Sequence, residues 1–326
     1  MAQERPRGEQ RALGPVLVTG AAGFLGGALV KRLVADGEHV VSSDRAQDRT
    51  TAAAGLQACD LTRQDEVERL LRDNPVDTII HAGAVSGPMV MADRPLDIWQ
   101  INVTGTAYLL QSALRSKVGR FVLCSSVDVY GSDPVGLIDE DAAFAPRSVY
   151  GASKVAAEAA LAGYASQHGI DGVALRLAWI YGPGRRTPTT LERLIRAGLA
   201  DEPIVLDGHA AELTHYIFVD DVVDGVLAAA RAAGALPRRA YNIAADGSVA
   251  MGSVMETLKA VLPTLRATFR EEPRSAAAAG YSLANTTRDL GYRPQVTLLE
   301  GLRRYVAALA ADQRASSPIA PHDRHR

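Results

Sequence analysis

Three glycines follow a short apolar run near the start of the chain, and this turn restricts the fold more than any other feature. Residues 15–19 predict a strand and residues 24–35 show helical periodicity, with Gly20, Gly23 and Gly26 at their junction. In a dinucleotide-binding turn, the first glycine permits the tight bend and the second admits a pyrophosphate. The third lets the helix pack closely on the sheet. An ordinary glycine-rich turn is the alternative.

Short apolar strands alternate with helical patterns as far as residue 184. Strands are predicted over 39–43, 56–59, 76–81, 120–125 and 172–177, and helices over 65–72, 98–116 and 150–168. This alternation predicts a Rossmann-type α/β fold, in which helices cover both faces of a doubly wound parallel sheet. Beyond residue 184 the order becomes less regular, with segments expected at 188–200, 204–206, 215–219, 221–233 and 239–244.

We therefore expect a nucleotide-binding domain over 15–184, with the strands near 215–219 and 239–244 returning to it. Residues 185–312 are expected to form mainly a smaller, partly interleaved C-terminal lobe that binds substrate. The polar ends, residues 1–14 and 313–326, are predicted to be disordered tails.

Composition excludes several classes of function. A net charge of −2 gives no electrostatic reason to expect nucleic acid or an anionic membrane as the main partner. Cys59 and Cys124 both lie in apolar, strand-like runs, so neither a disulfide framework nor a zinc site is expected. The N-terminus lacks the pattern of a signal peptide, and no apolar run reaches membrane-spanning length. The expected location is the cytoplasm, and the expected partner is a small molecule.

An acid at the end of the second predicted strand strengthens the dinucleotide interpretation. Asp44 is placed to bond the adenosine ribose hydroxyls and to repel a 2′-phosphate, which favours NAD over NADP. The neighbouring Arg45 offers the opposite possibility, because it could hold a 2′-phosphate. After the third strand, Asp60 and Leu61 are placed to contact adenine, although a helix N-cap explains Asp60 equally well.

Tyr150 and Lys154 are four residues apart in a helical pattern and therefore share one face. Lys154 is expected to bond the nicotinamide ribose, and its ammonium group to lower the pKa of the Tyr150 phenol. Ser126, at the end of the fifth strand, is expected to bond the same substrate oxygen. The chain has only four lysines against thirty-one arginines, so a lysine here fits a specific need. An exposed tyrosine and a solvated lysine are the alternative.

Nine segments in this order resemble the extended short-chain dehydrogenase/reductase family, in its NAD-dependent sugar epimerase/dehydratase group. The segments are Thr19–Gly26, Asp44, His81–Ala84, Asn102–Thr106, Ser125–Gly131, Tyr150–Lys154, Tyr181–Gly184, Val219–Val223 and Leu290–Pro294. The resemblance implies a homodimer built from the helices near 98–116 and 150–168, and a catalytic triad of Ser126, Tyr150 and Lys154. The residues expected to bind the cofactor are Gly20, Ala22, Gly23, Phe24, Leu25, Gly26, Asp44, Arg45, Asp60, Leu61, His81, Ala82, Gly83, Asn102, Tyr150 and Lys154.

Two departures from the family pattern concern the substrate. Trp179 stands where many nucleotide-sugar members have Asn, and Thr214-His215 stands where they have an Arg-Asp pair. Threonine removes a charged contact to a diphosphate, which puts a nucleotide-linked substrate in question. The loss could be compensated by Arg185, Arg186 or Arg193.

Several reactions are compatible with the same three catalytic residues. A sugar epimerase is favoured, and an NAD-dependent dehydrogenase or reductase of a sugar, sugar acid or small carbonyl compound is the alternative. Val127 cannot protonate a leaving hydroxyl, which argues against a 4,6-dehydratase, and the complete set of Ser126, Tyr150 and Lys154 argues against a non-catalytic NAD-binding protein. Asp128 is either an additional acid–base group or a hydrogen-bonding residue at the end of the strand. The candidate substrate residues are Val85, Ser86, Asp128, Trp179, Thr187 and His215.

Overall fold

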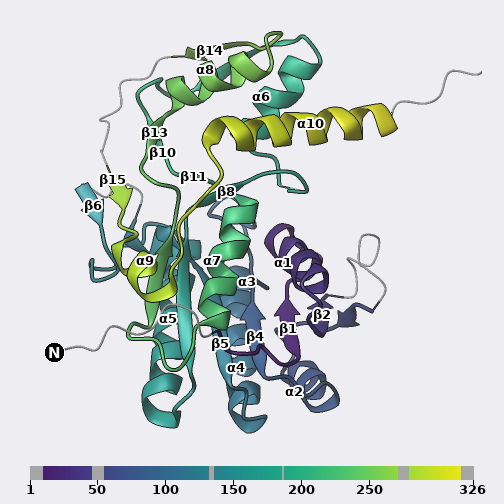
Figure 1. Ribbon diagram of the computed structural model, residues 1–326, viewed down its shortest axis with the longest axis vertical. Coiled ribbons are helices and arrows are strands. Elements are labelled where there is room, and N and C mark those ends of the chain that lie inside the picture. The colour runs from purple at the N-terminus through teal and green to yellow at the C-terminus, as the bar shows by residue number, and fades with distance from the viewer. Residues whose placement is uncertain (1–9, 46–54, 132–135, 186, 271–278, 317–326) are drawn as a thin grey trace, which may run out of the picture. The chain divides into compact units, whose positions relative to one another are not determined.

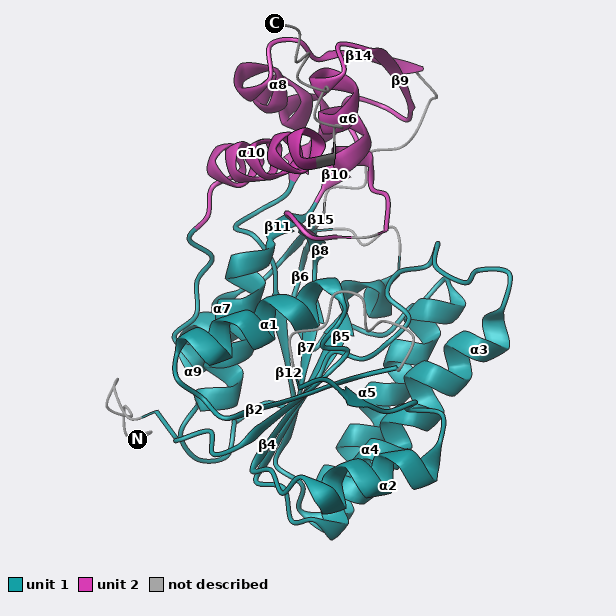
Figure 2. Ribbon diagram, turned by 90° about the vertical axis from the view of Figure 1, so that its right-hand side faces the viewer, with its two compact units in different colours: residues 1–180, 215–248, 277–295 teal, residues 181–214, 249–276, 296–326 magenta. Residues whose placement is uncertain are grey.

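A computed structural model describes residues 10–45, 55–131, 136–185, 187–270 and 279–316. The chain divides into two compact units (Figure 2). The first comprises residues 1–180, 215–248 and 277–295, and the second comprises residues 181–214, 249–276 and 296–326. None of the described helices combines the length and apolarity that crossing a membrane would require.

The first unit is built on a seven-stranded parallel sheet (Figure 1). Its order is β3-β2-β1-β4-β5-β7-β12. The strands are β1 (Val16–Thr19), β2 (Val40–Asp44), β3 (Gln57–Ala58), β4 (Thr78–His81), β5 (Arg120–Ser126), β7 (Gly172–Leu177) and β12 (Ala240–Ile243). The order reverses between β1 and β4, and ligands of open α/β sheets bind at such a switch point. The predicted doubly wound parallel sheet is confirmed.

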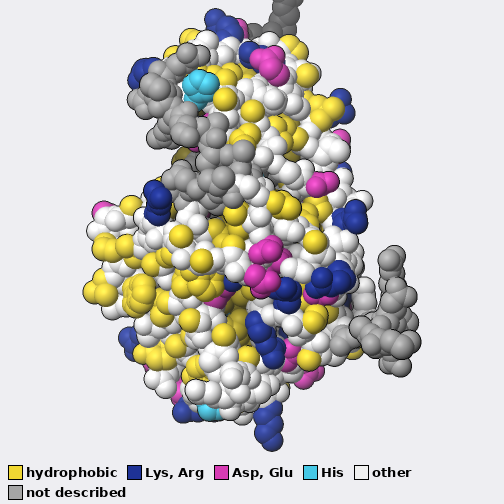
Figure 3. Space-filling model, turned by 90° about the vertical axis from the view of Figure 1, so that its left-hand side faces the viewer, with side chains coloured by type: hydrophobic (Ala, Val, Ile, Leu, Met, Phe, Trp, Pro, Cys, Tyr) yellow, Lys and Arg dark blue, Asp and Glu magenta, His cyan; other side chains and the backbone are white. Residues whose placement is uncertain are grey.

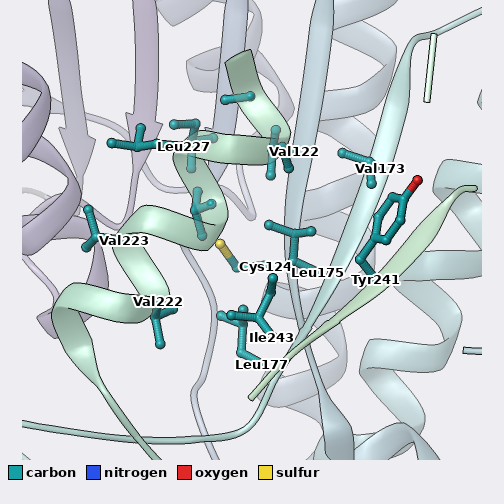
Figure 4. Packing of buried hydrophobic residues seen from close by; sticks show 14 of the residues in the cluster. Val122, Cys124, Val173, Leu175, Leu177, Val222, Val223, Leu227, Tyr241 and Ile243 are labelled. Atoms are coloured by element: carbon teal, nitrogen blue, oxygen red, sulfur yellow. The ribbon is translucent and has the colours of Figure 1, made fainter. Parts of the chain in front are cut away.

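Helices cover both faces of this sheet (Figure 2). One face carries α1 (Phe24–Ala35) and α7 (Val219–Arg231), and the other carries α2 (Gln64–Asp73), α4 (Gly105–Arg115) and α5 (Val149–His168). Alternate strand residues supply the two hydrophobic layers: Val122 faces α7, whereas Phe121 lies in the layer with α2, α4 and α5. Figure 4 shows the first layer, where Val222 and Leu227 of α7 lie over the strand residues.

Shorter elements complete the first unit. They are α3 (Pro95–Trp99), the π-helical turn η2 (Gln100–Thr104), the 3-10 helix η3 (Val127–Tyr130), β6 (Gly136–Ile138), β11 (Tyr216–Phe218), β15 (Ala279–Tyr281) and α9 (Ala284–Leu290). Strand β15 pairs with β6, and β11 pairs with β8 (Trp179–Tyr181).

The second unit contains two small sheets and three helices in its described part. The antiparallel pair is β10 (Leu213–Thr214) with β13 (Val249–Ala250), and the parallel pair is β9 (Pro203–Asp207) with β14 (Arg266–Arg270). The helices are α6 (Thr190–Leu199), α8 (Met251–Val261) and α10 (Leu298–Ser316). Helix α10 packs against α8 and α6.

Some boundaries differ from those expected. Leu13 is buried in the core of the first unit, so residues 10–14 are not a tail, and α10 continues through residues 313–316. The predicted tail residues 1–9 and 317–326 lie outside the described residues. The strands near 215–219 and 239–244 both lie in the first unit, as expected. Strand β12 takes the edge of the parallel sheet beside β7, whereas β11 pairs with β8 outside that sheet. Residues 220–238, 245–248 and 279–295, which were expected in the C-terminal lobe, also belong to the first unit.

Candidate active site

The glycine turn lies at the switch point of the sheet and leaves room for a diphosphate. Gly20 adopts a φ of 70°, and a β-carbon there would lie 2.7 Å from the carbonyl oxygen of Ala82. At Gly26, a β-carbon would lie 2.0 Å from the carbonyl oxygen of Gly20, so only glycine allows α1 to pack this closely. Gly23 is the N-cap of α1 and has no side chain that would cover the first amide groups of the helix. These features fit the pyrophosphate of a dinucleotide.

Asp44 is joined directly to this turn. One carboxylate oxygen accepts a hydrogen bond from the amide of Ala22 at 2.9 Å, and the other accepts one from the amide of Arg45 at 2.7 Å. Each carboxylate oxygen has a second lone pair available to a ribose hydroxyl. Asp44 therefore orders the turn and remains suited to bind the adenosine ribose. Phe24 and Leu25 are half-buried in the first turn of α1.

Asp60 orders the chain ahead of α2. Its carboxylate accepts hydrogen bonds from the amide and the hydroxyl of Thr62, at 2.9 and 2.8 Å, and its own amide donates to Glu66. The N-cap of α2 is Arg63, so Asp60 stabilises the preceding turn and is not the cap. Leu61 lies close to Gly83, just beyond the end of β4.

The His81 side chain is occupied inside the protein. Its Nδ1 lies 2.7 Å from the hydroxyl of Thr19 and its Nε2 lies 3.0 Å from the hydroxyl of Thr106. Burial lowers the pKa of His81 to about 3, so the ring is neutral. His81 thus links β1, β4 and α4, while the backbone of Ala82 and Gly83 lies against the glycine turn.

Asn102 connects the segment after β4 to helix α5. Its Oδ1 accepts from the amide of Val85 at 2.8 Å, and its Nδ2 donates to the carbonyl of Val85 and to the hydroxyl of Ser153. The Ser153 hydroxyl in turn donates to the carbonyl oxygen of Tyr150. Asn102 lies in the π-helical turn η2, an uncommon conformation that often marks functional sites.

Tyr150 and Lys154 are buried on one face of α5. The Nζ of Lys154 donates to the carbonyl oxygen of Cys124 at 2.8 Å and lies 5.7 Å from the centre of the Tyr150 ring. Tyr150 is 7% exposed and Lys154 is 5% exposed, so the alternative of solvated side chains is wrong. Burial lowers the pKa of Lys154 to about 8, and the amine is therefore mainly an ammonium ion at neutral pH.

Ser126 lies at the same end of β5, two residues beyond Cys124. Its hydroxyl accepts a hydrogen bond from the amide of Asp128 at 3.2 Å and caps η3. Gly151 allows η3 to approach the first turn of α5, because a β-carbon there would lie 2.7 Å from the carbonyl oxygen of Asp128. Ser126 and Asp128 are thus held next to the turn of α5 that carries Tyr150. Burial raises the pKa of the Asp128 carboxyl.

The other candidate substrate residues are spread more widely. Trp179 is 46% exposed, with its ring edge-on to Tyr216, and His215 packs edge-on against Tyr281 with ring centres 4.7 Å apart. Val85 is buried on Asn102 and Ser86 is exposed, whereas Thr187 belongs to the second unit. Two residues absent from the sequence analysis, Ser153 and Glu158, bond elements of the site to each other. The available signal for Glu158 was its position four residues after Lys154, which places the two on one face of α5.

A dinucleotide turn at the switch point, together with a buried Tyr–Lys pair at the end of β5, defines an enzyme of the short-chain dehydrogenase/reductase type. Residues 16–244 match the family model described as the NAD dependent epimerase/dehydratase family. The chain belongs to this family, whose members depend on NAD.

Full-length relatives agree with this membership. UDP-glucose 4-epimerase of Mycolicibacterium smegmatis is 34% identical over 310 residues, covering 89% of this chain and 96% of that protein. The dTDP-glucose 4,6-dehydratase of Streptomyces griseus is 29% identical, covering 94% and 97%. Among solved structures, MoeE5 in complex with UDP-glucuronic acid and NAD superposes with a TM-score of 0.80 at 29% identity, covering 92% of this chain and 100% of MoeE5.

Proposed function

We propose that this protein is an NAD-dependent 4-epimerase of a nucleotide-linked hexose. The observation that carries the proposal is the buried Lys154 ammonium, held on the carbonyl of Cys124 and 5.7 Å from the Tyr150 ring. The M. smegmatis relative, which matches nearly the whole chain, is a UDP-glucose 4-epimerase. Val127 supplies no acid where the 4,6-dehydratase pattern has one, which argues against that branch of the family.

In this proposal the chain holds the cofactor and moves one proton. The turn from Gly20 to Gly26 would hold the NAD diphosphate and Asp44 the adenosine ribose. The bound cofactor would supply the hydride chemistry, because its oxidised form accepts a hydride from the sugar carbon and its reduced form returns it. Tyr150 takes the proton of the substrate hydroxyl and later returns it, while Ser126 bonds the same oxygen. The Lys154 ammonium stabilises the phenolate form of Tyr150, which is the form that can accept this proton.

Cofactor retention separates the epimerase from the alternative dehydrogenase. We expect purified protein to retain NAD and to convert UDP-glucose and UDP-galactose into each other with no net absorbance change at 340 nm. Mass-resolved chromatography of the sugar nucleotides gives the product ratio. Stoichiometric NADH release with any active sugar would establish a dehydrogenase in its place. One observation favours the dehydrogenase: Thr214 is neutral where many nucleotide-sugar members have an Arg, and its hydroxyl donates to the carbonyl of Val249 within the second unit.

The carboxyl group of Asp128 favours a substrate with a neutral hexose over one with a uronate. Its carboxyl lies next to Ser126, and a substrate carboxylate nearby would place two like charges in a buried site. The aromatic groups on this side are uncharged at neutral pH, because burial raises the pKa of Tyr281 and lowers that of His215. Neither can therefore neutralise a uronate.

We accordingly expect turnover of UDP-galactose to exceed that of UDP-galacturonate by at least about tenfold in kcat/KM. Asp128→Ser should narrow this ratio, and Asp65→Asn, which removes an exposed carboxylate of α2, should leave it unchanged. Parallel kinetics on the two substrates give the ratio. Equal ratios in the parent protein and Asp128→Ser would exclude Asp128 as the residue that discriminates.

We also infer that the protein forms a homodimer through the face formed by α3 and the start of α5. Leu96 and Trp99 of α3 are 66% and 41% exposed, and Val149 of α5 is 41% exposed. Figure 3 shows hydrophobic side chains gathered on one face of the molecule. Covering apolar side chains of this size would favour association. Sedimentation equilibrium should give twice the chain mass, and Trp99→Glu should give the monomer; a monomeric parent protein would refute the inference.

A further inference from the structure

Glu158 forms a buried ion pair on the helix that carries Tyr150 and Lys154. It lies one turn beyond Lys154 on α5, and its carboxylate accepts two hydrogen bonds from Arg176 of β7, through Nε at 3.1 Å and Nη2 at 2.8 Å. The same carboxylate accepts from the hydroxyl of Ser125 on β5 at 2.5 Å. The Glu158 and Arg176 side chains are only 6% and 5% exposed. One carboxylate therefore ties α5 to two central strands.

Arg176 extends these contacts to the helix η3. Its Nη1 donates to the hydroxyl of Tyr130 at 2.7 Å and to the carbonyl oxygen of Glu140 at 2.9 Å. The Tyr130 hydroxyl then donates to Asn242 of β12 at 2.8 Å. Because η3 begins directly after Ser126, the ion pair connects the segment following Ser126 with the helix bearing Tyr150 and Lys154.

The titratable groups that face Lys154 come from three elements. On β4, His81 is neutral, because burial lowers its pKa to about 3. On β5, Cys124 is a neutral thiol, because burial raises its pKa to about 12. On α5 itself, Tyr150 presents its ring and Glu158 its carboxylate. Burial lowers the pKa of Lys154 to about 8, and the Glu158 carboxylate opposes this effect.

We propose that Glu158 is a positioning residue, which supplies the buried negative charge that keeps Lys154 an ammonium ion and fixes α5 against β5 and β7. The catalytic importance of this assignment rests on the role given to Lys154 in the proposed function. The effect of the Glu158 charge on the pKa of Lys154 does not depend on the substrate, so it applies to any reaction that needs the Lys154 ammonium ion.

The Glu158 charge should raise the pH at which Lys154 loses its proton. A lysine whose pKa is about 8 is an ammonium ion below that pH and loses its proton above it. Removing the Glu158 charge lowers this pKa further, so the ammonium ion disappears closer to neutral pH. The alkaline limb of the kcat profile should then move to lower pH, an effect that loosened packing alone would not produce.

The small number of lysines allows Lys154 to be observed directly. Protein labelled with 13C at lysine Cε should give four resonances, and Lys154→Arg identifies the one from Lys154. In Glu158→Gln we expect the midpoint of its pH titration to fall by about one pH unit. Ser125→Ala removes a hydrogen bond of the carboxylate but keeps both charges, so its midpoint should match that of the parent protein.

A double variant covers the case in which Glu158→Gln does not fold with Arg176 left unpaired. Glu158→Gln/Arg176→Met removes both charges, and its Lys154 midpoint should also fall, although by less than in Glu158→Gln, because the positive charge of Arg176 partly offsets that of Glu158. An unchanged or higher midpoint in the folded variant would overturn the proposal, as would an equal fall in Ser125→Ala. These titrations need no substrate, so a protein without epimerase activity would refute the proposed function and leave the Glu158 result intact.

Discussion

Tyr150→Phe should lower kcat by about 10²–10⁴-fold, the contribution typical of a positioned acid–base group. Phenylalanine keeps the buried ring near Lys154 but removes the only atom that can carry the proton. The fold and the glycine turn should remain unchanged, so the variant should still bind NAD. Epimerisation of UDP-galactose under saturating substrate, with NAD binding measured by calorimetry, gives both quantities.

Tyr164→Phe is the matched control on the same helix. Tyr164 lies ten residues beyond Lys154 on α5 and donates its hydroxyl to Gln111. Loss of this hydroxyl should therefore cost about 1 kcal/mol of stability and leave kcat near the parent value. If Tyr150→Phe bound NAD and turned over at the parent rate, the assignment of Tyr150 as the proton carrier would be abandoned.

Gly26→Ala should destabilise the protein and impair NAD binding together. The added methyl carbon would lie 2.0 Å from the carbonyl oxygen of Gly20, and the nearest atoms are backbone, which cannot rotate away. Helix α1 must then move from the sheet, at a cost of about 1–3 kcal/mol. We expect the dissociation constant for NAD to rise by at least about tenfold, because we propose that the same turn holds the diphosphate.

Gly27→Ala tests the same change one residue along the helix. A β-carbon there would meet its nearest neighbour, the carbonyl oxygen of Ala21, at 3.5 Å, an ordinary contact. Alanine in a helix is about 0.5–1 kcal/mol more favourable than glycine, so this variant should be slightly more stable than the parent. Urea unfolding of both apo variants gives the comparison. Equal stabilities would show that α1 does not need a glycine at 26.

Local patterns were sufficient to predict the elements that depend on neighbouring residues. Strand and helix periodicity located the main sheet, and the spacing from Gly20 to Gly26 located the glycine turn, which the structure places at the switch point. The four-residue interval between Tyr150 and Lys154 likewise predicted a shared face, which the structure shows as a buried pair.

Contacts between distant segments were the part that sequence patterns did not reveal. The ring of His81 bonds Thr19 and Thr106, both far along the chain, so its internal role could not be read from the strand that carries it. The partnership of Glu158 with Arg176 depends on β7 lying beside β5, a pairing that only the sheet order specifies. The polar and charged character of residues 1–14 as a whole predicts a tail, although the Leu13 side chain within this segment is buried.

The bond between Asp44 and the amide of Ala22 has a consequence for redesign of coenzyme preference. Exchanging the acid for a small neutral residue to admit a phosphorylated ribose would also remove the acceptor of the Ala22 amide in the glycine turn, at a cost of about 1 kcal/mol. Selectivity and loop order are thus linked through one side chain. A variant that accepts NADP well would have to replace the lost acceptor as well as the lost charge, and asparagine is the smallest change that retains an oxygen in this place.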